Sequence, residues 1–192
     1  MISSVDDNLG NYRIPEAARA LQEFVDDMSN WYVRRCRDRF WAKGMEQDKV
    51  NAYMTLYTAL VTVCKAAAPM IPFMTEEIYQ NIVRSVDASA KESIHLCDFP
   101  VYNAEQVDEK LEADMDLVLK IVVLGRACRN GAAIKNRQPI GQMYVKAEAS
   151  LPDYDEAIIL DELNVKNITF TDDVSNFTTY NFKPQLNTVG PK

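Results

Sequence analysis

Hydrophobic positions along the chain recur mostly at helical spacing. From Pro15 to about Phe40, apolar residues follow one another three or four positions apart, which predicts a long amphipathic helix with a stop signal at Gly44. Similar patterns predict further helices over residues 47–68 and 105–130. The helix expected over residues 47–68 also carries small residues on another side, which indicates close packing inside a bundle.

The segment Ala68–Tyr79 interrupts this helical pattern with two prolines. Pro69 disfavours helix in the residue before it, whereas Pro72 can occupy the first turn of a new helix. Glu76 and Glu77 then fall near the helix start, where a helix dipole favours acids. The segment therefore predicts a sharp corner between two helices.

The periodicity changes after Gly141. Residues 142–147, 165–170 and 178–183 read as strands, with a short helix over 155–163 between the first two. We therefore predict a mainly α protein, a helical bundle followed by a small α/β appendage. The expected divisions are residues 1–12 as a lead-in that is disordered or left over from cloning, 13–137 as the helical domain, and 138–192 as the α/β extension, cut short at its C-terminus.

Composition narrows the class of protein. The 192 residues are 47% hydrophobic and carry a net charge of −7, and no apolar run reaches the length of about 20 residues that crosses a bilayer. Four widely spaced cysteines lack the paired spacing of zinc sites and read as reduced thiols, so we expect a cytoplasmic protein without a membrane partner. A single histidine, His95, excludes schemes that need two.

Positive charge and aromatic rings gather in the segment Asn30–Trp41. It holds both tryptophans and four arginines, a combination that suits RNA because arginine contacts phosphates and flat rings stack on bases. The alternative is packing, because an apolar stripe runs through this helix and Trp31 borders it. That stripe comprises Leu21, Phe24, Met28 and Tyr32 and is continued by Arg35 and Arg39.

Two consequences follow from the stripe. Arg34 and Arg37 lie off it and are expected to face solvent, whereas Arg35 and Arg39 can face RNA, another domain or their own helix end. Phe24 lies on the stripe, so Phe24→Ala is expected to cost about 3 to 5 kcal/mol as a core truncation.

A second basic region follows in residues 117–147, which contain no Asp or Glu. Residues 131–141 are expected to form its exposed turn, with Lys135 and Arg137 at the tip.

These segments together resemble one family. Asn-Trp-Tyr, Arg-Arg and Arg-Phe-Trp within residues 30–41 resemble the anticodon-binding domain of isoleucyl-tRNA synthetases. The two-proline corner resembles one shared with the valine, leucine and methionine enzymes, and Ile134–Ile140 resembles a turn that leaves the helical domain. The resemblance runs from about Tyr12 to the last residue, so the chain is expected to be a fragment cut at both ends.

The resemblance implies a bundle of the class I synthetase anticodon-binding type, with tRNA and the catalytic domain of the same parent chain as partners. The parent would attach isoleucine to tRNA with ATP and magnesium. The family's two nucleotide-binding motifs are absent here, so no catalytic residue, metal or cofactor is expected in this chain. The candidate tRNA-binding residues are Trp31, Arg34, Arg37, Trp41, Lys43, Lys135 and Arg137.

Two other functions stay open on the sequence. The chain can instead be an acidic helical module whose basic regions meet an acidic protein partner, or the same region of a valine- or leucine-tRNA ligase, since a fold does not transfer specificity.

Overall fold

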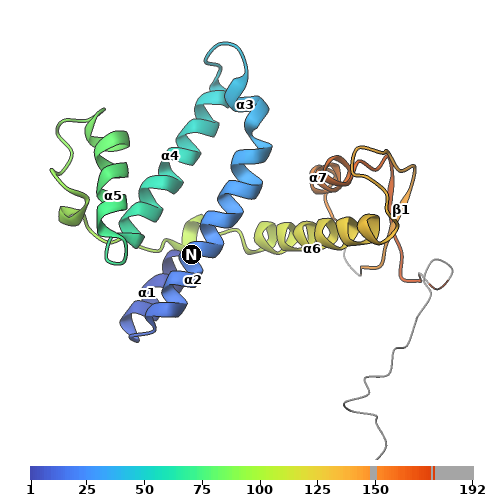
Figure 1. Cartoon of the computed structure of the whole chain (residues 1–192), viewed down its shortest axis with the longest axis horizontal. Helices are drawn as coiled ribbons and strands as arrows, with labels where there is room; N and C mark the ends of the chain where they lie inside the picture. Colours follow the sequence, from blue (N-terminus) through green and yellow to red (C-terminus); the bar gives the residue numbers. More distant parts are fainter. Residues whose placement is uncertain (148–150, 174, 176–192) are drawn as a thin grey trace, which may run out of the picture. The chain divides into compact units, whose positions relative to one another are not determined.

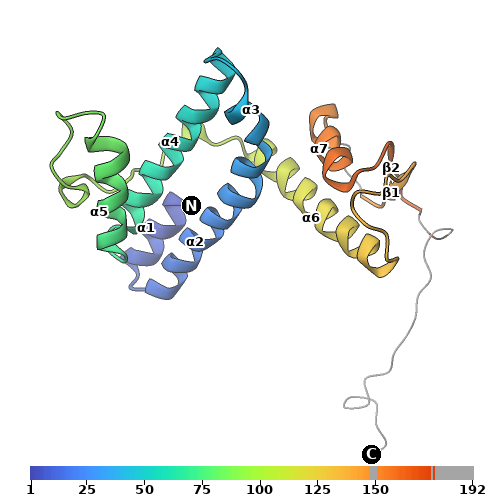
Figure 2. The same cartoon turned by 45° about the horizontal axis from the view of Figure 1, so that its top comes forward.

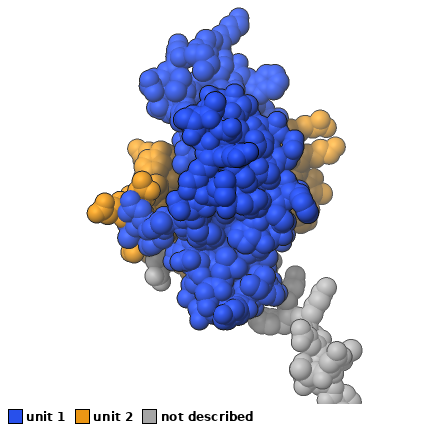
Figure 3. All heavy atoms as spheres, turned by 90° about the vertical axis from the view of Figure 1, so that its left-hand side faces the viewer, with its two compact units in different colours: residues 1–104 blue, residues 105–192 orange. Residues whose placement is uncertain are grey.

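The computed structural model describes residues 1–147, 151–173 and 175, and it divides the chain into two compact units. Unit 1 comprises Met1–Ala104 and unit 2 Glu105–Lys192, coloured blue and orange in Figure 3. The helical domain was expected to extend to residue 137. The structure instead places the last long helix in unit 2, because that helix packs against the α/β segment that follows it.

Unit 1 begins with two helices, α1 (Ile2–Gly10) and α2 (Ile14–Asp27), which lie side by side (Figure 2). Met1, Val5 and Leu9 are four residues apart and so share one side of α1. Val5 is fully buried, in a cluster with Ala17 and Leu21 of α2 and with Ala66 and Ala67 of α4 (Gln47–Ala67). Residues 1–12 were expected to be a disordered lead-in, but most of them form a helix. The helix was missed because its apolar stripe consists of only three residues.

Beyond α2, the chain continues as a π-helical stretch, η1 (Met28–Val33), and then as α3 (Arg37–Trp41). A turn leads into α4 (Gln47–Ala67), which returns beside α2 and α3 (Figure 1). Gly44 sits in this turn with φ +79°, a conformation that side chains other than glycine rarely adopt. The predicted long helix and its stop near Gly44 are thus present, with a change of helical winding inside it.

The buried side of α4 is made of small residues. Ala52, Cys64, Ala66 and Ala67 are buried, while the exposed fractions of Tyr53 and Tyr57 are 43% and 37%. Neighbouring helices therefore pack closely against the small residues, as helix packing at short distance requires. The side of α4 that carries the two tyrosines is left partly open.

The two-proline corner has the predicted form. Pro72 occupies the first turn of α5 (Pro72–Tyr79), which continues as the π-helical η2 (Gln80–Arg84). Thr75 is buried, and its hydroxyl donates to the carbonyl oxygens of Ile71 and Pro72 at 3.1 Å each. Tyr79 packs with Cys64, Ala68 and Ile94 in a second core cluster of unit 1.

Glu76 fastens the following segment to α5. Its carboxylate accepts hydrogen bonds from the Ser93 hydroxyl at 2.8 Å, the Ile94 amide at 2.9 Å and the Gln80 amide group at 2.7 Å. Burial raises the pKa of Glu76, but these three donors outweigh burial and lower it. The Glu76 carboxylate therefore binds the segment that holds Ser93 and Ile94, and it lies beyond the first turn of α5, where a helix dipole acts most strongly.

Two short 3₁₀ turns follow, η3 (Ile94–Leu96) and η4 (Ala104–Gln106). Unit 2 then contains α6 (Glu109–Gly131), β1 (Met143–Val145), α7 (Asp153–Leu163) and β2 (Ile168–Phe170). The two strands pair in parallel, with Met143 opposite Ile168 and Val145 opposite Phe170. The mainly α fold with a small α/β appendage is thereby confirmed, while the strand predicted over 178–183 lies outside the described residues.

Helices α6 and α7 approach each other closely. A Cβ atom on Gly125 would lie 2.4 Å from Cδ1 of Leu163, whose side chain is buried. Val118, Val122 and Ile159 are fully buried beside this contact. Among the helices that the structure describes, none is both long and apolar enough for a membrane span.

Candidate nucleic-acid interface

One end of unit 1 presents an aromatic and cationic surface, which we call the hairpin tip and define by Arg37, Trp41, Lys43 and Met45. Trp41 ends α3 with 83% of its surface exposed, and Met45 is 69% exposed in the turn. Arg37 and Lys43 are also exposed, and Arg37 precedes Trp41 by one helical turn. Figure 1 shows this turn at the free end of the α3–α4 hairpin.

Side-chain contacts across the hairpin hold the tip in place. The Arg39 guanidinium donates to both carboxylate oxygens of Asp48, at 2.7 and 2.8 Å, and Lys49 Nζ donates to the Ala42 carbonyl at 2.7 Å. The Phe40 and Tyr53 rings lie 5.0 Å apart between centroids. Arg39 thus has a partner in the first turn of α4, which is none of the three partners that the sequence analysis considered.

The Arg39–Asp48 pair also shifts the ionisation of both groups. The hydrogen bond from Arg39 lowers the pKa of Asp48, and the same bond raises the pKa of Arg39. Both side chains are therefore charged at neutral pH, and the pair joins the end of α3 to the first turn of α4.

Trp31 and Arg34 lie further back on the same helix. The Arg34 guanidinium carbon is 5.7 Å from the Trp31 ring centroid, and Arg34 Nε donates to the Asn30 carbonyl at 2.8 Å. Trp31 is half-buried and Arg34 exposed. Trp31 lies in η1 and Arg34 directly after it, ahead of the start of α3 at Arg37.

Unit 2 carries a second cationic feature, the basic turn of residues 132–140. Lys135 and Arg137 are exposed on it, as predicted. Hydrogen bonds fix the turn to the end of α7, from the Ile140 amide to the Asn164 carbonyl at 3.0 Å and from the Asn164 side chain to the Asn136 carbonyl at 3.1 Å. The turn is therefore held at its middle and at its C-terminal end.

The main support of the basic turn is Arg129, which sequence reasoning did not single out. Its guanidinium is buried and donates to four backbone carbonyl oxygens, two in or beside the basic turn and two at the end of α7. These carbonyls belong to Lys135 (3.1 Å), Gln138 (2.8 Å), Leu163 (2.6 and 2.9 Å) and Asn164 (3.1 Å). The sequence offers no signal for this role, because the partners are main-chain atoms that any residue supplies.

Arg126 also makes a contact inside unit 2, an ion pair with Glu162 of α7. Its Nη2 lies 2.5 Å from Oε2 of Glu162, whose side chain is only 3% exposed. Residues 117–147 contain six cations, Lys120, Arg126, Arg129, Lys135, Arg137 and Lys146. Arg126 and Arg129 make contacts inside unit 2, whereas Lys135 and Arg137 are the exposed pair on the turn.

The hairpin tip and the basic turn present cationic side chains and, at the tip, an exposed ring. Within the described part of the chain, no group of three or more His, Cys, Asp or Glu side chains could hold a metal ion. His95 lies exposed on η3, where its amide donates to the Ser93 hydroxyl at 3.2 Å. Exposed cations beside exposed rings can bind phosphate and stack on flat groups.

Comparison with known proteins places this arrangement in a family. The family model "Anticodon-binding domain of tRNA ligase" matches residues 1–145, and the chain belongs to this family. The chain is 52% identical over 190 residues to isoleucine–tRNA ligase of Clostridium novyi (strain NT), a match that covers 99% of the chain and 18% of that protein.

Further relatives carry the same name. Isoleucine–tRNA ligase of Clostridium kluyveri is 50% identical over 192 residues, covering 100% of the chain and 18% of the relative. Isoleucine–tRNA ligase 2 of Bacillus cereus (strain ATCC 14579) is 43% identical over 188 residues, covering 96% and 17%. The chain therefore spans about a fifth of the length of these curated relatives.

Proposed function

We propose that this chain is the tRNA-binding region of an isoleucine–tRNA ligase and that it holds the anticodon arm of isoleucine tRNA. The family match over residues 1–145, together with relatives at about 50% identity that are named isoleucine–tRNA ligases, is the observation that carries the proposal. The remainder of the parent chain would perform the ATP- and magnesium-dependent attachment of isoleucine.

The hairpin tip supports RNA as the ligand. In a chain of net charge −7, Arg37 and Lys43 are exposed beside Trp41. Cations of this kind contact phosphates and a bare indole stacks on an unpaired base. Trp31 and Arg34, whose guanidinium carbon is 5.7 Å from the Trp31 ring centroid, would add a further ring and cation to the contact.

The basic turn supplies the second proposed contact. Lys135 and Arg137 project from a turn that Arg129 and Asn164 hold in place, so little conformational entropy is lost when phosphate binds. An acidic protein partner would also meet these cations, but it would not need the exposed tryptophan of the tip.

Titration with an isoleucine tRNA transcript at several salt concentrations tests the proposal. The logarithm of the association constant should fall linearly with the logarithm of the salt concentration, and Arg37→Ala or Lys43→Ala should each reduce the slope by about 1. Arg19→Ala is the matched control, because Arg19 is an exposed cation on α2. It lies 22 positions before Trp41, roughly 33 Å along a helix.

Comparison of ligands separates the alternatives. Tight binding to an acidic peptide with no measurable binding to any tRNA at low salt would overturn the proposal in favour of a protein-interaction module. Equal affinity for valine or leucine tRNA would leave RNA binding intact and remove the isoleucine assignment.

A further inference from the structure

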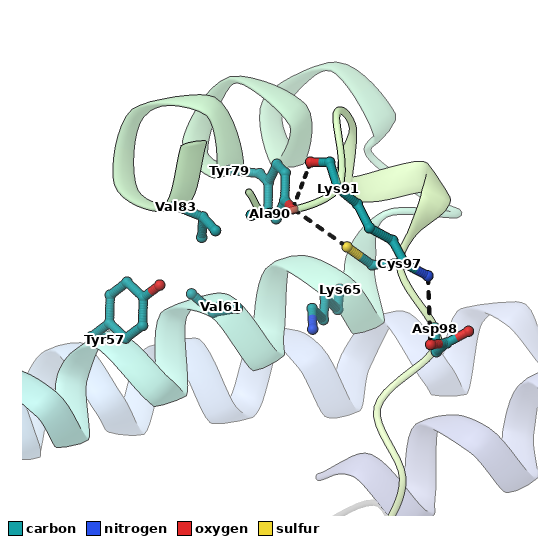
Figure 4. A pocket seen from close by; sticks show the side chains of 9 residues that line it. All are labelled: Tyr57, Val61, Lys65, Tyr79, Val83, Ala90, Lys91, Cys97 and Asp98. Atoms are coloured by element: carbon teal, nitrogen blue, oxygen red, sulfur yellow. Dashed lines mark hydrogen bonds and ion pairs between the residues drawn. The ribbon is translucent and has the colours of Figure 1, made fainter. Parts of the chain in front are cut away.

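A pocket in unit 1 lies apart from the residues assigned above. It has a volume of about 340 Å³ and opens between α4, η2 and the segment 90–98 (Figure 4). Ligand pockets in proteins typically have volumes of about 300 to 1,000 Å³. The cavity is therefore large enough for one small organic group and too small for a folded segment.

The two ends of the pocket differ in chemistry. Figure 4 shows the Tyr57 ring at one end, Val61 and Val83 on facing walls, and Lys65, Lys91 and Asp98 toward the other end. Tyr57 is 37% exposed, so its ring is accessible to a ligand. An aromatic end joined by apolar walls to an end with two cations and one anion suits a flat molecule that carries a negative group.

Internal hydrogen bonds make the far wall firm. The Tyr79 hydroxyl donates to the Lys91 carbonyl at 2.9 Å and accepts from the Cys97 thiol at 3.6 Å. Burial, reinforced by the bond with Cys97, raises the pKa of Tyr79 to about 12, so the phenol keeps its proton. Glu76 ties the Ser93–Ile94 segment to α5, as described above, so the pocket exists without a ligand.

The cationic end is available to an anion. Lys91 Nζ lies 3.7 Å from an Asp98 carboxylate oxygen, and the two side chains are 52% and 99% exposed. An exposed pair at this distance contributes little, so Lys91 can turn toward a phosphate at small cost. Lys65 reaches the cavity from the last turn of α4, where a cation is also favoured by the helix dipole.

We propose that this pocket binds a single nucleotide, with its base stacked on Tyr57 and its phosphate between Lys65 and Lys91. Two sources share this chemistry, an unpaired nucleotide of the bound RNA and a free mononucleotide. The first source rests on the proposed function, since it requires RNA on unit 1, whereas the second does not.

Titration of the ¹⁵N-labelled 192-residue chain with each ribonucleoside 5′-monophosphate, followed by amide chemical shifts, tests the pocket directly. Saturable shifts are expected at the amides of α4, η2 and residues 90–98. Tyr57→Leu and Lys65→Gln should each weaken binding about tenfold, as loss of one stacked base or one phosphate contact does, whereas Tyr57→Phe should keep most of it. Tyr154→Leu and Arg19→Gln are controls of matched chemistry outside the pocket.

A second arm uses an RNA stem-loop with an unpaired loop. If Tyr57→Leu and Lys65→Gln weaken both RNA and mononucleotide, the nucleotide comes from RNA; if they weaken the mononucleotide alone, the ligand is free. The proposal is wrong if no monophosphate causes saturable shifts at the pocket amides and both variants bind RNA with unchanged affinity. Equal shifts with inorganic phosphate alone overturn it as well, because the base then contributes nothing.

The proposed function fails separately. If RNA binds neither the unsubstituted chain nor any variant, the anticodon-arm assignment is wrong. The monophosphate titration still tests whether the pocket binds a nucleotide.

Discussion

Arg129 is a buried cation whose charge is met by main-chain oxygens. Burying an ionised group without partners is costly, and here carbonyls from two separate segments take the place of water. The planar guanidinium suits this task, since it donates in several fixed directions at once.

Arg129→Lys is therefore expected to destabilise unit 2 by about 2 to 4 kcal/mol, because an ammonium group cannot reach the same carbonyls and leaves some of them unpaired. Urea unfolding with a probe in unit 2 measures the loss. Lys120→Ala, a change at an exposed residue of the same helix, should alter the free energy of unfolding by no more than about 0.5 kcal/mol relative to the unsubstituted chain. A small effect of Arg129→Lys would show that the hydrogen bonds to the basic turn are dispensable.

Glu76 predicts a dependence of stability on pH. Its hydrogen bonds lower its pKa below the ordinary value of 4.5, so its contribution to the free energy of unfolding is present above that value. The contribution is lost as pH falls through the pKa of the folded state. Glu76→Gln should cost about 1.5 to 3 kcal/mol at pH 7, because an amide turns a donor toward groups that already donate.

Unfolding midpoints in urea from neutral to acidic pH test this expectation. The difference in unfolding midpoint between Glu76→Gln and the unsubstituted chain should shrink as the solution becomes more acidic. Glu77→Gln, on the exposed neighbour, should leave the pH profile unchanged. A pH-independent difference would mean that the side chain acts through packing alone.

Between elements, the contact of α6 with α7 depends on the absence of a side chain at residue 125. Gly125→Val would place a branched side chain where even a Cβ lies 2.4 Å from Leu163, and Leu163 is too buried to move freely. We expect a loss of about 1 to 3 kcal/mol from overpacking, measured by thermal or urea unfolding. Gly131→Val at the end of the same helix, where nothing lies within 4 Å, is the control for helix propensity alone.

Elements with strong local signals were predictable from the sequence. Pro72 begins α5 as expected, and the alternating pattern after Gly141 predicted β1. The helix expected over residues 105–130 begins instead at Glu109, where the Leu111 amide donates to the Asp108 carboxylate at 3.0 Å. Helix α1 was missed because its stripe is three residues long and only packing against α2 and α4 makes it useful. The small residues of the helix over residues 47–68 were predicted to allow close packing, and Ala52, Ala66 and Ala67 are buried in α4.

Candidate site residues divide in the same way. The exposure of Trp41, Lys43, Lys135 and Arg137 was predictable, since turns and helix ends lie at the surface. Phe24 was expected to be core and is only partly buried, so its truncation should cost less than the 3 to 5 kcal/mol expected from the sequence. The role of Arg129 depends on residues 34 positions away, which no local pattern encodes.

At the scale of the whole molecule, the division into two units makes a prediction about folding. Unit 1 has its own core clusters around Val5 and around Tyr79. Residues 1–104 expressed alone should therefore be helical by circular dichroism and unfold cooperatively in urea. A gradual, non-cooperative loss of helix would show instead that unit 1 needs unit 2 to fold.

The end of α7 and the basic turn both depend on Arg129, so we expect them to be kept or lost together in evolution. The end of α7 and the basic turn draw on the same guanidinium, so a shortened protein that ended before residue 151 would lose half of that cation's partners. Evolution cannot readily discard the α/β appendage while keeping the turn in its present shape. Homologues that lack α7 should accordingly replace Arg129 as well.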